Sequence, residues 1–309
     1  MRGQDLLSVT DLDAPRLELI IETAIAMKRD GSPALLSGKN IAFLFEKPSL
    51  RTRVSFEVGI KQLGGHPIYL APAEIGLGVR EPIKDVARVL SSYVDALIVR
   101  TASQDLLTEL AHWASIPVVN ALSDHEHPCQ ALADMLTIFE IKGRIQGIKV
   151  GYLGDGNNVA RSLTLACALA GASIGVASPV GYELSAADLE AAGKISAQSA
   201  TIQQVNDPRE AVRGADVVYT DVWASMGQEQ ESALRREAFA GYQVDAALVA
   251  LARPDAIVMH DLPAHRGEEI SDDVIESPQS VVFRQAENRL HAQKAALALI
   301  LGDNERQEL

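Results

Sequence analysis

The chain is poor in the residues that mark disulfide-linked, metal-binding or membrane-spanning proteins. It has only two cysteines among 309 residues, Cys129 and Cys167, and they lack the paired spacing of a structural metal site. Both fall in segments that we expect to be helical, in different domains, so we expect no disulfide between them. No apolar run approaches the roughly 20 residues that a membrane-spanning helix needs. We therefore expect no bound metal and no membrane partner.

Positive charge is also scarce. The chain has 28 Lys and Arg residues against 41 Asp and Glu residues, which gives a net charge of −13. Since no basic run is long enough to follow a nucleic-acid backbone, we expect no nucleic-acid partner. An acidic protein binds an anionic substrate only where positive charge is concentrated locally, and Arg51, Arg53 and Arg100 are candidates for that role.

The first residues lack the pattern of a secretory signal. Residues 1–10 contain no basic segment followed by an apolar core. Two cysteines without a pairing pattern also suit a reducing compartment. We therefore expect a cytoplasmic protein.

What the chain does contain is a regular alternation of strand-like and helix-like segments. Its 309 residues suggest two domains, and its 47% of hydrophobic residues suffices for their cores. Short apolar runs separated by helical patterns indicate parallel sheets covered by helices on both faces. The predicted fold class is α/β, with two doubly wound domains, parallel sheets and an active-site cleft between the domains.

The segments form two series. In the first, the strand candidates are 41–45, 68–70, 96–99 and 118–119, followed by helix candidates at 51–63, 82–92, 104–114 and 130–142. In the second, the strand candidates are 149–153, 174–177, 217–221, 257–260 and 281–283, and the helix candidates are 159–170, 186–193 and 208–213. Two glycines bracket a polar stretch at 143–147, which predicts a domain boundary there. We predict domains over 1–143 and 148–286, and a final helix from residue 287.

Polar residues stand where the predicted strands end. In open α/β sheets, ligands bind beyond the carboxyl ends of the strands. The residues that end or follow a strand candidate in this way are Ser49, Arg100, His127, Asn158, Asp221 and His260. We therefore expect these side chains to line one cleft.

Segment 45–53, Phe-Glu-Lys-Pro-Ser-Leu-Arg-Thr-Arg, joins a strand candidate to a helix candidate. Unpaired N–H groups and the positive end of the helix dipole favour an anion at such a junction. The guanidinium groups of Arg51 and Arg53 add paired donors that suit a phosphate. Taken alone, the segment also fits an ordinary capped helix with solvated arginines.

Four segments, in the expected order and over nearly the whole chain, resemble the signatures of the aspartate/ornithine carbamoyltransferase family. Segment 49–53 resembles its Ser-Thr-Arg-Thr-Arg, with Leu50 in place of Thr, and 127–130 is similar to its His-Pro-x-Gln. Segment 221–227, Asp-Val-Trp-Ala-Ser-Met-Gly, resembles the loop of the ornithine branch. Segment 260–263, His-Asp-Leu-Pro, is similar to that branch's His-Cys-Leu-Pro.

The resemblance implies a transferase that moves the carbamoyl group of carbamoyl phosphate to the δ-amine of L-ornithine. The products would be L-citrulline and phosphate, in arginine metabolism, and no cofactor would be needed. It also implies that the C-terminal helix 287–309 joins the first, carbamoyl phosphate-binding domain, while 148–286 binds ornithine. The assembly implied is a homotrimer or a multiple of trimers.

The first domain would hold carbamoyl phosphate. By resemblance, the phosphate contacts come from Ser49, Leu50, Arg51 and Thr52, and Arg289 matches a late arginine of the family near the phosphate. Leucine in place of threonine at position 50 should affect phosphate binding little if this position contributes only its backbone N–H.

After the phosphate is bound, the reaction still requires that the carbonyl oxygen be polarised, that the carbamoyl NH₂ be oriented and that a neutral amine be presented. Arg100 and His127, with the Thr52 hydroxyl, suit polarisation of the carbonyl oxygen, since donors aimed at a developing oxyanion usually contribute most. Gln130 can offer its side-chain oxygen to the carbamoyl NH₂. Taken alone, Arg100 would fit a surface ion pair and His127 a core or capping residue.

The second domain would hold ornithine. By resemblance, Asn158 binds its α-amino acid end, and the residues that complete the pocket are Asp221, Ser225 and Met226. By the same resemblance, Asp261 and Leu262 would contact carbamoyl phosphate, Leu262 through its backbone. Asp261 stands where the branch carries Cys, and we hypothesise that its carboxylate accepts a proton from the reacting amine or orients it. The alternative is that position 261 acts mainly through its backbone.

Other acceptors and other reaction classes remain open at this point. Putrescine and N-acetylornithine are possible acceptors, whereas aspartate is disfavoured because Asp221 suits a cationic substrate. An NAD-dependent oxidoreductase is suggested by Gly154-Asp155-Gly156, but Val159 replaces the third glycine and Ser178 the expected acid.

A metal hydrolase would have to use His125, Glu126, His127, His260 and His265. This set lacks the H-E-x-x-H spacing that puts two imidazoles on one helix face. A purely structural role would leave the clustering of polar residues at strand ends unexplained.

Overall fold

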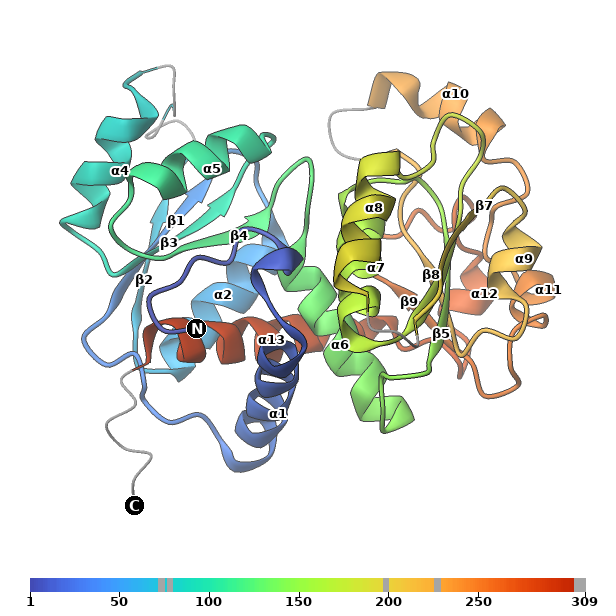
Figure 1. Ribbon diagram of the computed structural model, residues 1–309, viewed down its shortest axis with the longest axis horizontal. Coiled ribbons are helices and arrows are strands. Elements are labelled where there is room, and N and C mark those ends of the chain that lie inside the picture. The colour runs from blue at the N-terminus through green and yellow to red at the C-terminus, as the bar shows by residue number, and fades with distance from the viewer. Residues whose placement is uncertain (72–75, 77–79, 197–199, 225–228, 303–309) are drawn as a thin grey trace. The chain divides into compact units, whose positions relative to one another are not determined.

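The chain folds into two compact units in the computed structural model. The first contains Met1–Leu136 and the chain from Asn288 onward, and the second is Thr137–Glu287. Each unit holds a parallel sheet with helices around it (Figure 1), so the predicted α/β class with two parallel-sheet domains is confirmed. The residues that the structure describes are 1–71, 76, 80–196, 200–224 and 229–302.

The first unit is built on a parallel sheet in the order β2-β1-β3-β4. Its strands are β1 (Asn40–Phe45), β2 (His66–Leu70), β3 (Ala96–Arg100) and β4 (Val118–Leu122). All four were predicted, because their apolar runs are short and bounded by turn residues. β4 runs past its predicted end at residue 119, since Asn120 pairs with Val99 in spite of its polar side chain.

Helices cover both faces of this sheet. They are α1 (Ala14–Asp30), α2 (Leu50–Gln62), α4 (Ile83–Ser91), α5 (Gln104–Trp113), the first part of α6 (Pro128–Lys142) and most of α13 (Val282–Leu301). Successive residues of β1 point to opposite faces. Leu44 belongs to a core cluster with Val86 of α4 and Leu107 of α5, whereas the Phe43 ring lies 6.2 Å from the Phe56 ring of α2.

The N-terminal segment protects the edge of the sheet at β4. Leu6 forms a parallel bridge with Val119; its N–H donates to the Val118 carbonyl (2.9 Å) and its carbonyl accepts from the Asn120 N–H (2.8 Å). A short 3₁₀ helix, η1 (Val9–Asp11), follows. This pairing satisfies backbone groups that an open edge would expose to other chains.

The second unit carries a parallel sheet in the order β7-β6-β5-β8-β9. Its strands are β5 (Lys149–Leu153), β6 (Ser173–Ala177), β7 (Ile202–Val205), β8 (Val217–Thr220) and β9 (Ile257–His260). The edge strand β7 was not predicted, because Gln203 and Gln204 interrupt its apolar pattern.

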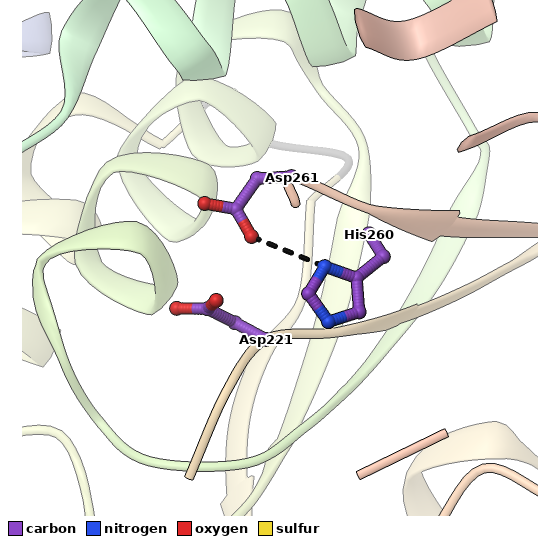
Figure 2. A group of neighbouring side chains, drawn as sticks. All are labelled: Asp221, His260 and Asp261. Atoms are coloured by element: carbon purple, nitrogen blue, oxygen red, sulfur yellow. Dashed lines mark ion pairs between the residues drawn. The ribbon is translucent and has the colours of Figure 1, made fainter. Parts of the chain in front are cut away.

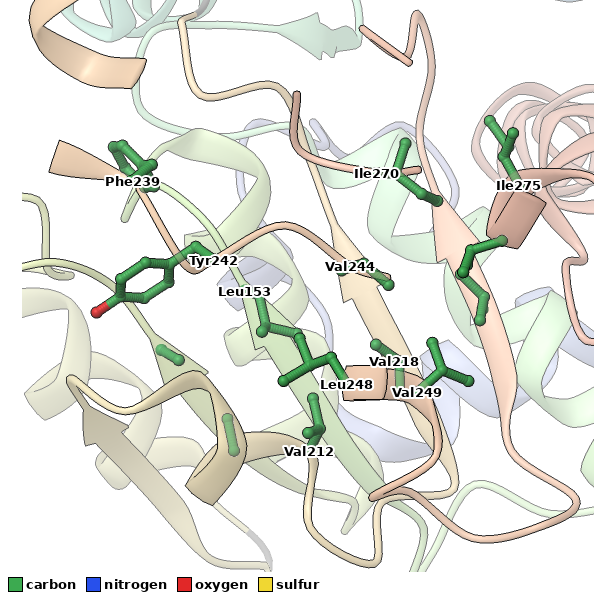
Figure 3. Packing of buried hydrophobic residues seen from close by; sticks show 14 of the residues in the cluster. Leu153, Val212, Val218, Phe239, Tyr242, Val244, Leu248, Val249, Ile270 and Ile275 are labelled. Carbon is green, nitrogen blue, oxygen red and sulfur yellow. The ribbon is translucent and has the colours of Figure 1, made fainter. Parts of the chain in front are cut away.

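The helices of the second unit are α7 (Asn158–Ala170), α8 (Ala186–Ile195), α9 (Pro208–Val212), α10 (Ser232–Ala238), α11 (Ala246–Val249) and α12 (Asp272–Ile275), with the 3₁₀ helix η2 (Glu229–Glu231). Figure 3 shows part of a buried cluster in which residues of α9, α11 and α12 pack around β5 and β8. In it, the Trp223 and Phe239 rings stack at 5.5 Å. This contact anchors the segment after β8 to α10.

One predicted strand is wrong. Residues 281–283 were expected to form a strand, but α13 begins at Val282. Pairing with β9 stops after a bridge between Val258 and Ser280 and one hydrogen bond from the Val281 N–H. The helical periodicity that follows therefore starts five residues earlier than the predicted 287.

Within the described ranges, every helix is too short or too polar to cross a lipid bilayer.

Candidate active site

The junction of β1 and α2 has the local structure of an anion site. Ser49 is the N-cap of α2, and its side chain makes no capping hydrogen bond to the first turn. The first-turn N–H groups therefore have no capping acceptor from this hydroxyl, at the end of the helix where the dipole favours negative charge. Leu50 is 77% exposed. Leucine in place of threonine thus changes a side chain that faces solvent and leaves the backbone N–H unchanged.

Two arginines converge on the buried hydroxyl of Thr52 in the first turn of α2. The Nη2 atom of Arg289 donates to Thr52 Oγ1 at 2.9 Å, and the Nη1 atom of Arg100 lies 3.5 Å from the same oxygen. All three side chains are buried. Arg100 ends β3 and Arg289 comes from α13, so two distant segments of the chain bring positive charge to the N-terminus of α2.

The two arginines of segment 49–53, Arg51 and Arg53, have different surroundings. Arg53 turns away from the junction: its Nε donates to Glu57 at 2.8 Å, and its guanidinium lies over the Tyr69 ring. This is the ordinary i,i+4 pair of a helix surface. Arg51, by contrast, has a buried Nε atom without a hydrogen-bond partner in the part of the chain that the structure describes.

His127 is buried at the start of α6, in the same unit as these arginines. Burial lowers the pKa of His127 well below its ordinary value, and the charges of Arg289 and Arg100 lower it further. The imidazole is therefore neutral at physiological pH. A neutral ring donates one N–H and keeps one acceptor nitrogen.

Gln130 presents an oxygen that no described residue uses. Its Nε2 donates to Asp134 Oδ1 at 2.8 Å, which fixes the amide orientation, since an oxygen there would face a carboxylate. The opposite atom, Oε1, is buried and has no hydrogen-bond partner among the described residues. An N–H donor on a ligand would satisfy it.

Cys129 lies between these two residues and takes no part in such chemistry. It is fully buried, and burial raises the pKa of the Cys129 thiol to about 12. Thiolate is the reactive form of cysteine, so this thiol is inert.

In the second unit, a tight turn follows β5. The Gly156 N–H donates to the Tyr182 carbonyl at 2.7 Å, and a Cβ atom at Gly156 would come within 2.4 Å of the backbone at Leu184. Only glycine fits there. Asn157 then caps α7 through its Oδ1 and donates its Nδ2 to Asp221 Oδ2 at 2.8 Å. The predicted residue Asn158 is the first of α7.

Asp221, His260 and Asp261 form a cluster at the ends of β8 and β9 (Figure 2). One ligand atom from each lies within 4.8 Å of the others. Asp221 is 5% exposed, and its Oδ1 accepts from the Val222 N–H at 2.7 Å. Burial raises the pKa of Asp221 well above its ordinary value, and the neighbouring carboxylate of Asp261 raises it further.

The His260 ring is held by hydrogen bonds to Leu262 and Glu269. Its Nε2 lies 3.0 Å from Glu269 Oε1, and its Nδ1 accepts from the Leu262 N–H at 2.9 Å. The hydrogen of the neutral ring is therefore assigned to Nε2. Burial lowers the pKa of His260, whereas the carboxylates of Asp261 and Glu269 outweigh that effect and raise it. The charged ring would carry a second proton on Nδ1, where it would displace the Leu262 N–H, so this hydrogen bond favours the neutral ring.

Leu262 owes its conformation to this contact. Its φ of +61° lies in the left-handed region, which costs free energy for any residue other than glycine. The hydrogen bond to His260 offsets that cost and directs the Leu262 backbone.

Arg235 is a functional candidate that the sequence analysis missed. This buried residue of α10 donates from Nη1 to Asp155 Oδ2 (2.7 Å) and to the Trp223 carbonyl (2.8 Å). It thereby ties the turn after β5 to the segment after β8, which carry Asn158 and Asp221. An arginine in a helix surrounded by charged residues gives no signal in the sequence that it is buried. Ser225 and Met226, predicted for the same pocket, lie outside the described residues.

The competing interpretations find little support in this geometry. In the oxidoreductase alternative, a pyrophosphate would use the first N–H groups of α7, but the Asn157 side chain already accepts from Val159 and Ala160. In the hydrolase alternative, Glu126 would ligate a metal, but its two oxygens accept from Ser8 and Val9.

Two groups of side chains in the described part of the chain have spacing that a metal ion could use. They are Asp221-His260-Asp261 and His265-Glu268-Glu269. In the first group, Asp221 is engaged by Asn157 and His260 by Leu262 and Glu269. These contacts give Asp221 and His260 roles that require no ion.

We predict that His127 makes the protein sensitive to acid. The unfolded chain takes up a proton on this residue below about pH 6.5, whereas the folded chain resists it. Stability is therefore lost as the pH falls through that value. The Tm of His127→Asn should decline less steeply than that of the wild type between about pH 7.5 and 5. The exposed neighbour variant His125→Asn is the control, and parallel curves for His127→Asn and the wild type would refute the prediction.

We predict the opposite sign for Asp221. A carboxyl whose pKa is raised by folding costs no stability below its unfolded value near 4, and costs progressively more as the pH rises. The Tm of Asp221→Asn relative to the wild type should therefore increase between about pH 4 and 8. Asp273→Asn, at an exposed residue of α12, should show no such trend. A constant difference for Asp221→Asn across this range would contradict the assignment.

Comparison with known proteins places this geometry in a family. Residues 4–140 match the family model described as aspartate/ornithine carbamoyltransferase, carbamoyl-P binding domain, and residues 146–300 match the Asp/Orn binding domain of the same family. The ornithine carbamoyltransferase of Anoxybacillus flavithermus is 52% identical over 97% of this chain and 98% of its own length. That of Thermococcus kodakarensis is 53% identical over 98% of each chain.

The fold of this chain is also similar to solved structures of ornithine carbamoyltransferases. The ornithine carbamoyltransferase of Pyrococcus furiosus superposes with a TM-score of 0.94, at 52% identity and over 97% of each chain. The Gloeobacter violaceus enzyme gives a TM-score of 0.89, at 49% identity, over 98% of this chain and all of the other. The chain belongs to the aspartate/ornithine carbamoyltransferase family.

Proposed function

We propose that this chain is an ornithine carbamoyltransferase, which converts carbamoyl phosphate and L-ornithine to L-citrulline and phosphate. The observation that carries the proposal is the convergence of Arg100 and Arg289 on Thr52 at a helix N-terminus, in a protein with a net charge of −13. Relatives that carry this name are 52–53% identical over nearly the full length. A Pyrococcus furiosus relative, also 52% identical, is named anabolic, which supports a role in arginine biosynthesis.

The phosphate of carbamoyl phosphate is assigned to the N-terminus of α2. The donors would be the backbone N–H groups and side chains of Ser49, Leu50, Arg51 and Thr52, together with Arg289. Among the described residues, the Nε atom of Arg51 has no hydrogen-bond partner and the Ser49 side chain makes no capping hydrogen bond, and both observations support this assignment. An anion bound there would gain from both the guanidinium groups and the helix dipole.

The carbamoyl group is assigned to Arg100, His127 and Gln130. As the δ-amine attacks the carbonyl carbon, negative charge grows on the carbonyl oxygen, and Arg100 and His127 would stabilise it. The Oε1 atom of Gln130, which has no hydrogen-bond partner among the described residues, would accept from the carbamoyl NH₂ and fix the plane of the group. The new C–N bond forms as the C–O bond to phosphate breaks.

Ornithine is assigned to the second unit. Asn158, Ser225 and Met226 would hold its α-amino acid end, and the buried carboxylate of Asp221 would pair with an ammonium group. Burial makes this carboxylate costly to ionise, and a bound cation would relieve that cost. Asp261 would accept the proton that the attacking amine loses, and Leu262 would present its backbone to the substrate.

The domain roles and the assembly belong to the same proposal. Residues 1–143, with the helix from 287 to 309, would form the carbamoyl phosphate-binding domain, and 148–286 the ornithine-binding domain. We further propose a homotrimer, or a multiple of trimers, in the cytoplasm. The two buried free cysteines are compatible with a reducing compartment.

An acceptor panel tests the function. Purified protein and carbamoyl phosphate are supplied with ornithine, putrescine, N-acetylornithine or aspartate, and each carbamoylated product is quantified. We expect kcat/KM for ornithine to exceed the others by at least tenfold, or about 1.4 kcal/mol. Preference for another amine would keep the phosphate assignment and overturn that of the second unit, and inactivity with every acceptor would overturn the proposal.

A pair of variants tests the role of Asp261. Asp261→Ala removes the carboxylate, and we expect it to lower kcat/KM for ornithine by about 10²-fold, within the usual contribution of a general base. Asp273→Ala, at an exposed carboxylate of the same unit, should remain within about twofold of the wild type. Near-full activity of Asp261→Ala would show that position 261 acts through its backbone.

A further inference from the structure

Glu126 is a buried carboxylate of the first unit that the proposed reaction does not use. It is 1% exposed and immediately precedes His127. Its Oε1 accepts from the Ser8 hydroxyl at 2.6 Å, and its Oε2 accepts from the Val9 N–H at 2.9 Å. Each carboxylate oxygen is thus bound to the N-terminal segment, more than one hundred residues away in sequence.

The N-terminal segment 6–11 is fixed to the first unit by burial and by backbone hydrogen bonds. Leu6 and Val9 are buried, and Leu6 is hydrogen-bonded to β4 through both its N–H and its carbonyl. Ser8 and Asp11 close a capping box around η1. The Glu126 carboxylate accepts from the first N–H of this 3₁₀ helix, a donor that has no partner within the helix itself.

On its other side, Glu126 belongs to a tight turn that ends at His127. The Ser123 N–H donates to the Glu126 carbonyl at 2.9 Å, and the Glu126 N–H donates to Ser123 Oγ at 3.0 Å. The His127 carbonyl then accepts from the Gln130 N–H at 3.0 Å, which begins α6. The Glu126 side chain is therefore a fixed attachment of the turn directly before His127.

We propose that Glu126 is a positioning residue, which clamps η1 to the 123–127 turn and so holds the His127 ring in place for the carbonyl oxygen. The inference rests on the proposed function, because that function defines the task of His127. A donor stabilises a developing oxyanion only within a narrow range of distance and angle. Loss of the clamp would leave the Val9 N–H buried without this acceptor and would free the turn to shift.

The clamp should affect the chemical step more than substrate binding. The phosphate donors proposed above lie on α2 and α13, outside the 123–127 turn. A misplaced His127 would therefore lower kcat while leaving KM for carbamoyl phosphate nearly unchanged. A general loss of folding would instead lower the active fraction and the Tm together.

Steady-state kinetics of single and double variants test the proposal. We expect Glu126→Ala to lower kcat about tenfold, less than the 10²–10³-fold cost of removing a donor outright, with KM for carbamoyl phosphate within twofold. Ser8→Ala, which removes one of the two hydrogen bonds, should lower kcat less. The double variant should match Glu126→Ala, because both changes break one contact. The control His125→Ala alters an exposed side chain of the same turn and should stay within twofold.

Rescue by the conservative variant separates geometry from charge. In Glu126→Gln, the amide oxygen can accept from Val9 while the amide nitrogen donates to the Ser8 hydroxyl, which both donates and accepts. We expect kcat within threefold of the wild type for this variant. A Glu126→Gln variant as slow as Glu126→Ala would overturn the clamp.

Other outcomes also decide the matter. The wild-type acceptor panel tests the proposed function separately, so a failure there is distinguishable from a failure here. With an active wild type, the proposal is overturned if Glu126→Ala keeps kcat within twofold, or if the effects of Ser8→Ala and Glu126→Ala multiply in the double variant. If Glu126→Ala does not fold, Ser8→Ala and Glu126→Gln decide, and a Ser8→Ala kcat equal to that of the wild type would refute the clamp.

Discussion

The hydrogen bond from Arg289 to Thr52 is the contact on which the first unit's site depends. It joins α13 to α2 across 237 residues of sequence, and it brings a buried cation to a helix N-terminus. Arg100 approaches the same hydroxyl from β3. Two guanidinium groups buried so close together repel one another, and an anionic ligand would offset that repulsion. Burial, together with the same positive field, keeps His127 neutral, which leaves its ring one N–H donor and one unprotonated nitrogen.

The second unit has the opposite charge at its strand ends. Asp221 and Asp261 lie beside His260, and burial together with repulsion from Asp261 makes the ionisation of Asp221 costly. A cationic substrate is the natural complement of such a site. The arrangement is maintained by groups that would not touch a substrate, because Arg235 links Asp155 to Trp223 and Asn157 links the α7 N-terminus to Asp221. The site thus lowers the stability of the folded chain in favour of function, as is common at active sites.

The short motifs were predictable because each combines a chemical need with a local structure. Ser49, His127 and Asp221 end or follow predicted strands, so periodicity placed them at an edge of a sheet. Arg51, Thr52 and Gln130 were identified only through the resemblance of their segments to family signatures. Arg53 belonged to the same motif, yet it pairs with Glu57 on the helix surface. Which of two arginines one turn apart faces a ligand depends on the helix face that the sheet covers, and local sequence does not carry that information.

The amino-acid sequence alone determined the α/β class, the parallel sheets and the order of the site segments, because hydrophobic periodicity and turn residues act over short distances. Only the tertiary structure revealed the partners of these segments. Arg235, Asn157 and Glu126 look like ordinary surface residues in the sequence, and each is buried or engaged through a residue at least 60 positions away. Hydrogen bonds between distant segments depend on how the elements pack, and packing is decided by the whole chain at once.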